Sequence, residues 1–245
     1  MKKLSFIVLL TAVIIICMSA GFHSGKPAVL IFSKTNGYHH ACIPVGAAAI
    51  MKLGRENGFD VDSTTDSLQF TKKNLKKYDA VIFLCPTGEV LGTNEQNAFK
   101  QYIQNGGGFV GIHSATDCGY TWAWYGQLVG AYFKSHPAQQ EATLHIIDKN
   151  FPATQSLPDT WVRRDEWYNF KDVNPDVNVL IKLDEKSYTG GENNGNHPMA
   201  WYHNFDGGRA FYTGLGHTDE SWADPIFLKH LLGGIEWAMK KPSAK

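Results

Sequence analysis

Cysteine is scarce in this 245-residue chain, and the four cysteines that occur do not suggest a disulfide framework. Cys17 lies in an apolar stretch near the amino terminus, which leaves Cys42, Cys85 and Cys118 for the rest of the chain. An odd number of cysteines cannot pair completely, so a small fold held by disulfides is not implied. Hydrophobic residues make up 43% of the chain, enough for one substantial core without cross-links. We therefore expect one domain, over residues 27–240.

The chain also carries no formal net charge at pH 7. Basic and acidic residues number 23 each. Removing residues 1–20 would take away Lys2 and Lys3 alone, so 23 − 2 leaves 21 basic against 23 acidic residues. A near-neutral protein lacks the positive field that attracts nucleic acid or anionic membranes. We therefore expect no nucleic acid partner.

Long apolar runs are also scarce in this chain. The run from Leu4 to Ala20 falls short of the roughly 20 residues that span a bilayer comfortably. Two lysines precede it and polar residues follow, which is the layout of a secretory signal. Residues 1–20 are therefore predicted to be a signal peptide of a secreted or periplasmic protein, with no membrane span after processing. Lipid anchoring through Cys17 is the alternative, although Ile16 before it is not the small residue that such processing favours.

Local metal-binding motifs are absent as well. No H-E-x-x-H or C-x-x-C spacing fixes two ligands on one segment. Several histidines and two carboxylates could still form a metal site once the chain is folded. We predict no cofactor and assign no metal ligand, with a divalent metal as the alternative. Internal repeats and low-complexity segments are not evident either.

Strands and helices alternate through about the first 130 residues. Apolar runs predict strands at 28–32, 59–64, 80–84 and 109–112. Helices are predicted at 43–53, around Leu75 after Thr71, and from a cap at 93–96 to Asn105. This alternation is typical of a parallel sheet covered by helices on both faces. The predicted fold class is three-layer α/β with a mostly parallel sheet.

The C-terminal half has another pattern. Strands are predicted at 142–147, 177–183, 199–203 and 209–213, with few helices between them. Asp224 and Pro225 then open a last helix that runs to Met239. We expect the extra strands to extend the same sheet, with long loops over its edge.

The glycine-rich segment 106–117 combines a buried strand with a tight turn. The turn residue is His113, where some enzymes carry a nucleophile, and Asp117 follows one helical turn later. Such a residue projects at the carboxyl edge of a parallel sheet, where open α/β folds bind ligands. Imidazole moves protons or binds metals but is a rare nucleophile for acyl transfer. The segment indicates a site without serine or thiol hydrolase chemistry, and a buried structural histidine is the alternative.

Other polar residues gather in loops after apolar runs. If the strands are parallel, the loops after the first and fourth strands share one edge, which would bring His40 near His113. At most one of His39 and His40 should face the site, because adjacent histidines usually point in different directions. Asp117 either orients His113 or is an ordinary carboxylate at a helix start. The predicted catalytic residues are His113, Glu166, His217, His40 and Asp117.

Glu166 lies within an aromatic run that contains Trp161, Trp167 and Tyr168. Aromatic walls raise the pKa of a carboxyl group by desolvation, so Glu166 is predicted to act as a general acid or base. Pairing of this carboxylate with Arg163 or Arg164 is the alternative.

Aromatic residues near the polar clusters suggest the ligand class. Flat rings beside carboxylates suit the apolar faces and hydroxyls of sugars, although large aromatics usually belong to the core. The expected partner is a small-molecule sugar, and no oligomeric state is predicted. The predicted substrate-binding residues are Tyr38, Trp124, Asp165, Tyr168, His197 and Trp201.

Six segments together resemble the ThuA-like (trehalose utilisation) family, over about residues 28–237. They are SKTNGYHH at 33–40, GGGFVGIHSATD at 106–117, SHP at 135–137, DEWYNF at 165–170, HPMAW at 197–201 and GRAFYTGLGHT at 208–218. The resemblance implies a fold like that of class I glutamine amidotransferases, which is also flavodoxin-like. Amidotransferase domains carry a cysteine where this chain has His113, and Cys118 lies several residues beyond, so glutaminase activity is not expected.

The family is linked to the breakdown of trehalose and related disaccharides through 3-keto derivatives. The resemblance therefore implies a carbohydrate-processing enzyme that performs acid/base chemistry on a disaccharide or 3-keto-glycoside, as a sugar isomerase, a lyase or a glycoside-cleaving enzyme. A non-catalytic carbohydrate-binding protein and a metal-dependent hydrolase are the alternatives. An export signal departs from the cytoplasmic location expected of most members, and it suggests processing of glycans in the periplasm or at the cell surface.

Overall fold

The computed structural model describes residues 25–240, so the predicted signal peptide lies outside the described residues. No helix among the described residues is long and apolar enough to cross a membrane. The helices are α1 (Ile43–Asn57), α2 (Lys72–Leu75), α3 (Thr93–Gln104), α4 (Ala123–Val129) and α5 (Pro225–Met239). The strands are β1 (Ala28–Phe32), β2 (Asp60–Thr64), β3 (Ala80–Leu84), β4 (Gly108–Ile112), β5 (Tyr132–Ser135), β6 (Gln140–Ile146), β7 (Thr160–Asp165), β8 (Asn169–Lys171), β9 (Asn178–Leu183), β10 (His197–Phe205) and β11 (Gly208–Thr213).

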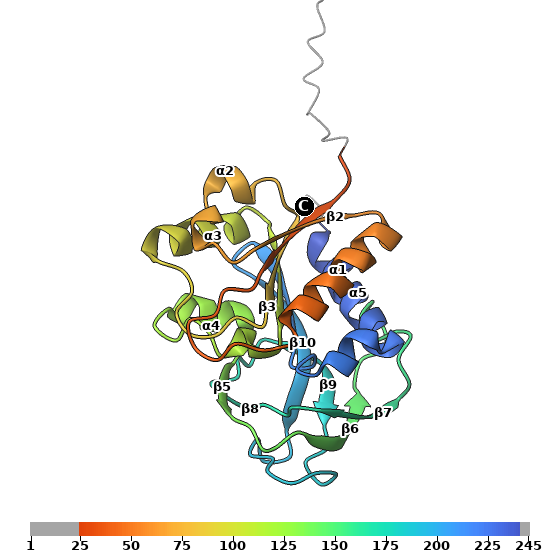
Figure 1. Ribbon diagram of the computed structural model, residues 1–245. Coiled ribbons are helices and arrows are strands. Elements are labelled where there is room, and N and C mark those ends of the chain that lie inside the picture. Colours follow the sequence, from red (N-terminus) through yellow and green to blue (C-terminus); the bar gives the residue numbers. More distant parts are fainter. Residues whose placement is uncertain (1–24, 241–245) are drawn as a thin grey trace, which may run out of the picture.

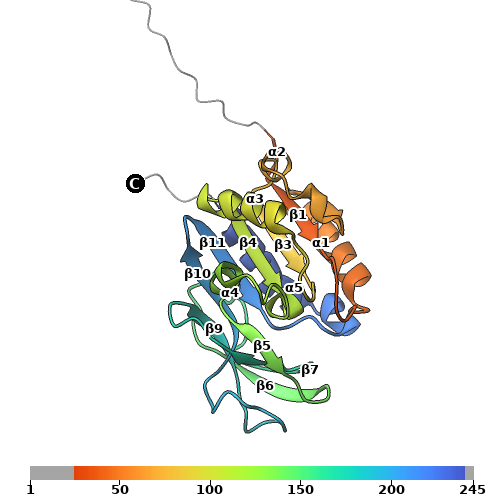
Figure 2. The same ribbon diagram turned by 90° about the vertical axis from the view of Figure 1, so that its left-hand side faces the viewer.

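A nine-stranded sheet in the order β2-β1-β3-β4-β11-β10-β9-β6-β7 forms the centre of the fold. The strands from β2 to β11 pair in parallel, whereas β10, β9, β6 and β7 join by antiparallel pairing. Figure 2 shows this sheet with the extra strands continuing below its parallel part. The predicted α/β class and sheet extension are thus confirmed, and the extra strands prove to be antiparallel. Strands β5 and β8 form a separate two-stranded sheet.

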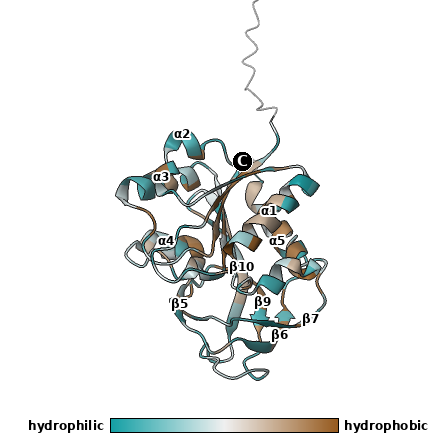
Figure 3. Cartoon of the chain, in the orientation of Figure 1, coloured by the Kyte–Doolittle hydropathy of each residue, from teal (hydrophilic) through white to brown (hydrophobic). Residues whose placement is uncertain are grey.

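Helices cover both faces of the parallel part (Figure 1). Helices α1 and α5 lie on one face, and α2, α3 and α4 lie on the other. Every residue of β3 and β4 is buried, which explains why both strands appear in the sequence as short, nearly continuous apolar runs. Figure 3 shows the apolar residues gathered along the central strands and the inner sides of α1 and α5, with hydrophilic residues outside.

Local signals mark some of the helix boundaries. Helix α1 ends at Gly58, which adopts φ 78°, and Asp224 caps α5 by accepting a hydrogen bond from the amide of Ile226. The predicted cap at residues 93–96 is wrong, because α3 begins at Thr93 and its N-cap is Gly92, which has no side chain to donate or accept. Tertiary packing of the buried face of α3, which includes Phe99 and Ile103, therefore sets where this helix lies.

The sequence interpretation omitted α4, β5, β7 and β8. Each is short, and β7 alternates buried with exposed residues in a stretch that carries Arg163, Arg164 and Asp165. The turn after β4 also differs in detail from the predicted elbow, because a 3₁₀ turn (His113–Thr116) follows the strand and α4 starts only at Ala123.

Candidate functional site

Three of the predicted histidines lie at the carboxyl edge of the parallel strands. His113 follows directly after β4, His217 comes shortly after β11, and His40 lies in the loop between β1 and α1. Because β1, β3, β4 and β11 are neighbours in the sheet, the loops that follow them meet at this edge. The ring centroid of His40 lies 4.8 Å from that of His113 and 5.2 Å from that of His217.

His113 occupies a strained turn. Its φ of 50° is left-handed, a conformation that costs a residue other than glycine about 1–2 kcal/mol. The Tyr212 hydroxyl donates a 2.7 Å hydrogen bond to the His113 carbonyl and helps to hold the turn. The ring of His113 is fully buried, and its centroid lies 4.8 Å from that of His40 and 4.9 Å from that of His217. Left-handed residues of this kind cluster at functional sites, which is where the sequence placed His113.

Glu166 completes the cluster from a distant part of the sheet. It directly follows β7, the last strand in the sheet order, and four successive antiparallel pairings give β7 the same direction as β11, so β7 also ends at the carboxyl edge. Its Oε2 lies 3.3 Å from Nε2 of His113 and 3.1 Å from Nδ1 of His217. These two histidine nitrogens are 3.0 Å apart. Potential ligand atoms of His40, His113, Glu166 and His217 all lie within 4.8 Å of one another, so the four residues could hold a metal ion.

The pKa of Glu166 shifts in the direction opposite to the prediction. Burial does favour the neutral acid, but hydrogen bonds from His113 and His217 outweigh it and hold the pKa well below its ordinary value. Neither arginine of β7 pairs with this carboxylate, because Arg163 pairs with Asp165 instead. Glu166 is therefore an ionised carboxylate rather than an acid with a raised pKa.

The pKa values of His40 and His217 shift in opposite directions. Burial opposes a charge on His217, but its hydrogen bond to Glu166 and the nearby carboxylates outweigh that effect and raise its pKa. Burial, together with the charges that His113 and His217 can carry, lowers the pKa of His40 to about 3. At neutral pH His40 is therefore neutral, while the position of His217 favours a positive charge.

The neighbouring histidines of the first loop are clearly separated by the fold. His40 is 2% exposed, and its Nδ1 lies 3.4 Å from the Ser114 hydroxyl. His39 is exposed, and its Nδ1 lies 3.2 Å from the Thr35 hydroxyl. Tyr38, predicted to bind substrate, is 66% exposed and stands edge-on to His40 at 4.8 Å between ring centroids.

Asp165 was predicted to bind substrate, but it supports the backbone of the site. It is completely buried, and its carboxylate accepts hydrogen bonds from the amides of Gly216 and His217, both at 3.1 Å. The same carboxylate lies 3.1 Å from the guanidinium of Arg163, which leaves it no open face for a ligand. Asp165 therefore fixes the loop that carries His217.

An aromatic wall closes one side of the cluster. The Tyr168 ring lies 4.3 Å from that of His113 and 4.3 Å from that of Phe133. Among residues 25–240 the Tyr168 hydroxyl has no hydrogen-bond partner. Its oxygen is not completely buried, so it can bond to a ligand. His136, noted in the sequence only as part of the SHP segment, stacks on Tyr168 and approaches Oε1 of Glu166 to 3.4 Å.

Asp117 does not orient His113. The Nδ1 atom of His113 lies 3.1 Å from the carbonyl of Gly214, and this carbonyl fills the role predicted for Asp117. Asp117 instead accepts a 2.6 Å hydrogen bond from the Tyr120 hydroxyl, and burial raises its pKa.

Three other predicted substrate-binding residues do not join the cluster. Trp201 is fully buried and donates to the carbonyl of Val129, and His197 is fully buried between Glu185 and the carbonyl of Tyr168. Trp124 donates to Asp206 in the turn that precedes β11, at the opposite edge of the sheet. Trp167 and Tyr125 also belong to the core. Most of the aromatic residues that suggested a sugar therefore have structural roles.

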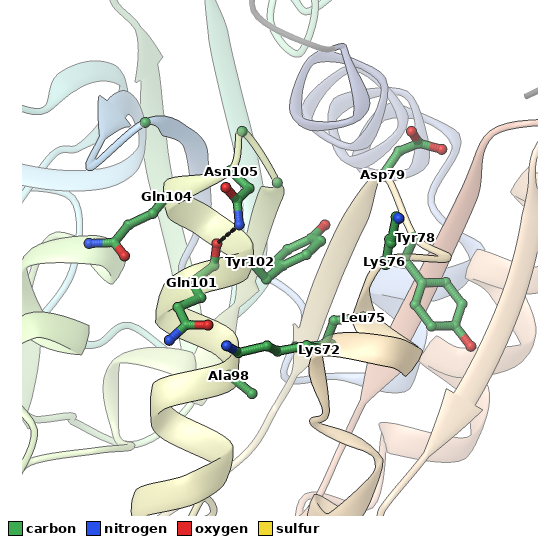
Figure 4. A pocket seen from close by; sticks show the side chains of 13 residues that line it. Lys72, Leu75, Lys76, Tyr78, Asp79, Ala98, Gln101, Tyr102, Gln104 and Asn105 are labelled. Atoms are coloured by element: carbon green, nitrogen blue, oxygen red, sulfur yellow. Dashed lines mark hydrogen bonds between the residues drawn. The ribbon is translucent and has the colours of Figure 1, made fainter. Parts of the chain in front are cut away.

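A depression of about 880 Å³ lies away from this cluster. Its floor includes Asp79 before β3 and Gly107 before β4, so it sits at the amino ends of the parallel strands. Figure 4 shows Lys72 and Tyr102 lining it from α2 and α3. Asp79 already accepts a hydrogen bond from the amide of Ala28. The side chains that line this depression do not form a cluster of reactive groups, so it is a weaker candidate for the functional site than the carboxyl edge of the sheet.

The chain is similar to one protein family and to several solved structures. The family model described as trehalose utilisation (ThuA) matches residues 28–238. A solved ThuA-like protein from Bacteroides uniformis is 27% identical, with 90% of this chain and 94% of that chain covered and a TM-score of 0.75. A ThuA-like protein from Parabacteroides merdae has the same fold at 22% identity, with 90% and 93% covered and a TM-score of 0.71. No curated protein matches the chain.

Proposed function

This chain belongs to the ThuA family, and from its site we propose that it is an enzyme that moves protons on a sugar or an oxidised sugar. The observation that carries the proposal is the buried cluster of His40, His113, Glu166 and His217 at the carboxyl edge of the sheet. The family description, trehalose utilisation, supports a sugar as the substrate class. The exposed ring of Tyr38 and the unpaired hydroxyl of Tyr168 supply surfaces for binding it.

Proton transfer on a sugar needs a base on one side of the substrate and a positively charged or proton-bearing group on the other side. Environments that push the pKa values of neighbouring groups apart create such a pair. His40 carries a free lone pair at neutral pH, and the His217 side of the cluster favours positive charge. We therefore assign His40 as the base, and His113 with His217 as the groups that face the substrate oxygen. Glu166 holds these two histidines instead of acting as the general acid or base predicted from the sequence.

A 3-keto-glycoside fits this arrangement. Its carbonyl makes the neighbouring C–H acidic, so His40 can remove that proton while negative charge develops on the carbonyl oxygen. The C–H electron pair becomes a C=C bond, the glycosidic C–O bond breaks, and the departing oxygen takes up one proton in exchange for the one that His40 removed, so the reaction is proton-neutral overall. No covalent intermediate with the protein is required, in agreement with the lack of a nucleophile at position 113.

A comparison of the two adjacent histidines tests this function. The purified protein is incubated with 3-keto-glycosides and ordinary glycosides, and the products are identified by mass spectrometry. We expect conversion of a 3-keto-glycoside, and His40→Gln should lower kcat by roughly 10²–10⁴-fold, the usual contribution of a general base. His39→Gln is the matched control, because the exposed His39 should leave kcat unchanged.

Two outcomes would contradict the proposal. Binding of disaccharides in calorimetry without any product would favour a non-catalytic carbohydrate-binding protein. Turnover that is equal in His40→Gln, in His113→Gln and in the unmodified protein would place the reaction elsewhere.

A further inference from the structure

Three atoms at the centre of the cluster converge on one point. They are Nε2 of His113, Nδ1 of His217 and Oε2 of Glu166, and they form a triangle with sides of 3.0, 3.1 and 3.3 Å. Ligands about 2.1 Å from one ion, in tetrahedral or octahedral geometry, lie roughly 3.0–3.4 Å apart. The triangle therefore has the dimensions of one face of a metal coordination shell.

The hydrogen-bond partners of His113 turn one of its ring nitrogens to this point. Gly214 offers only a carbonyl to Nδ1 of His113, so Nδ1 carries a hydrogen and Nε2 is the nitrogen that faces the triangle. Oε2 of Glu166 lies 3.3 Å from this Nε2, and Nδ1 of His217 lies 3.0 Å from the same nitrogen and 3.1 Å from Oε2. One divalent cation would satisfy all three atoms at once.

We propose that His113, His217 and Glu166 bind one divalent transition-metal ion. Two imidazoles and a carboxylate suit borderline metals such as Zn²⁺, Co²⁺, Mn²⁺ or Fe²⁺ better than the oxygen-preferring Ca²⁺ and Mg²⁺. Three protein ligands leave open positions on the metal, which is the arrangement of catalytic sites, whereas structural zinc sites are closed by four. His40 lies outside the triangle and would face a molecule bound at an open position.

The surroundings of the three ligands support this assignment. A histidine ligand usually donates its other N–H to a carbonyl or carboxylate, as His113 does to Gly214. Asp165 fixes the backbone of His217, and His136 approaches the second carboxylate oxygen of Glu166 at 3.4 Å. Each ligand is therefore held in place from outside, which allows a site to form from residues that share no local sequence spacing.

A bound metal ion would also assist the proposed reaction. A cation at the triangle would polarise the substrate carbonyl more strongly than a proton on His217, so it would acidify the C–H bond that His40 attacks. This step rests on the proposed function, but metal binding itself does not depend on any substrate.

Metal content and affinity can be measured without an activity assay. The full-length protein, free of a histidine tag, is treated with a chelator and titrated with Zn²⁺ and Co²⁺ by calorimetry, and the visible absorption of Co²⁺ is recorded. We expect one equivalent per chain, with the absorption bands of Co²⁺ bound by nitrogen and oxygen. Glu166→Gln and His217→Gln should each weaken binding by at least about ten- to one hundredfold, because even supporting residues have effects of that size.

A surface pair supplies the matched control. His145 lies 3.8 Å from Asp184, and both side chains are partly exposed. His145→Gln should therefore leave the affinity unchanged. Binding of less than one equivalent, or equal affinity in the unmodified protein and in a folded Glu166→Gln protein, would overturn the proposal.

The two proposals can fail separately. Stoichiometric metal binding without sugar turnover would keep the metal site and reject the proposed function. Turnover that persists at full rate after complete metal removal would keep the function and reject a part for the metal in the reaction, while less than one equivalent of bound metal would reject the site itself.

Discussion

At the scale of the residue, Asp165 shows how one buried carboxylate can hold a loop in place through hydrogen bonds to its backbone. It joins Arg163 of its own strand to the loop after β11, where it accepts the amides of Gly216 and His217. Arg163 also packs against the ring of Trp161 and is only 9% exposed. A buried pair of this kind adds little net stability, but the removal of one partner leaves the other charge uncompensated.

Asp165→Asn should therefore destabilise the protein by about 3–5 kcal/mol, the usual cost of breaking a buried ion pair. The change keeps the shape of the side chain, removes its charge and turns one accepting oxygen into an NH₂ group, so the loss reports on the charge together with the hydrogen bonds that this oxygen accepts. Urea unfolding followed by fluorescence measures it. The control is Asp159→Asn, which breaks the exposed pair with Lys149 and should leave the free energy of unfolding nearly unchanged. Equal midpoints for the two variants would show that Asp165 is not needed for stability.

At the scale of the element, α5 depends on close contact more than on helix propensity. Gly233 and Gly234 lie in its interior, where each glycine costs about 1 kcal/mol relative to alanine. A Cβ at Gly233 would lie 2.4 Å from the carbonyl oxygen of Pro152, and one at Gly234 would lie 2.3 Å from the ring of Phe211. The two glycines therefore let the helix approach β11 and the loop at residue 152.

Gly233→Ala should lower stability by about 1–3 kcal/mol, because overpacking against fixed backbone outweighs the gain in helix propensity. Thermal unfolding followed by circular dichroism measures the change. Glu236→Ala, at an exposed position of the same helix, should stay within about 0.5 kcal/mol of the unmodified protein. A stabilised Gly233→Ala protein would mean that the helix can move away from Pro152 at little cost.

At the scale of the whole molecule, buried neutral histidines tie the layers together and link folding to pH. His230 of α5 is fully buried, with Nδ1 2.9 Å from the carbonyl of Ala153 and Nε2 3.1 Å from the hydroxyl of Thr213. It thus connects the helix to β11 and to the loop that contains Ala153. Burial, with a smaller effect from Arg163, lowers its pKa from 6.5 to about 4.

The protein should therefore lose stability in mild acid. The unfolded chain binds a proton at this histidine near pH 6.5, whereas the folded chain does so only near pH 4, so the stabilising contribution is complete above pH 6.5 and disappears as the pH falls to 4. The loss from this one group is about 3 kcal/mol, at 1.36 kcal/mol per unit. Urea unfolding between pH 7 and pH 4.5 measures it, and His230→Gln should flatten the slope. An equal slope in both proteins would assign the acid sensitivity to other groups.

The sequence by itself determined the features that depend on local burial and backbone preference. Continuous apolar runs located β1, β3 and β4, and the glycine-rich segment located the turn at His113. Asp224 and Pro225 located the start of α5. These signals are local, because each reports how one segment meets the core or turns away from it.

Only the tertiary structure decided which side chains meet and what charge they carry. It separated His40 from His39, gave Asp165 to the backbone of the His217 loop, and moved Trp201 into the core. It also reversed the expected shift in the pKa of Glu166, because the histidines that lower it follow other strands, far away in the sequence. The nitrogens of His113 and His217 that touch at 3.0 Å belong to residues 104 positions apart. Local sequence patterns cannot encode such distances, since they arise from the order of strands in the sheet.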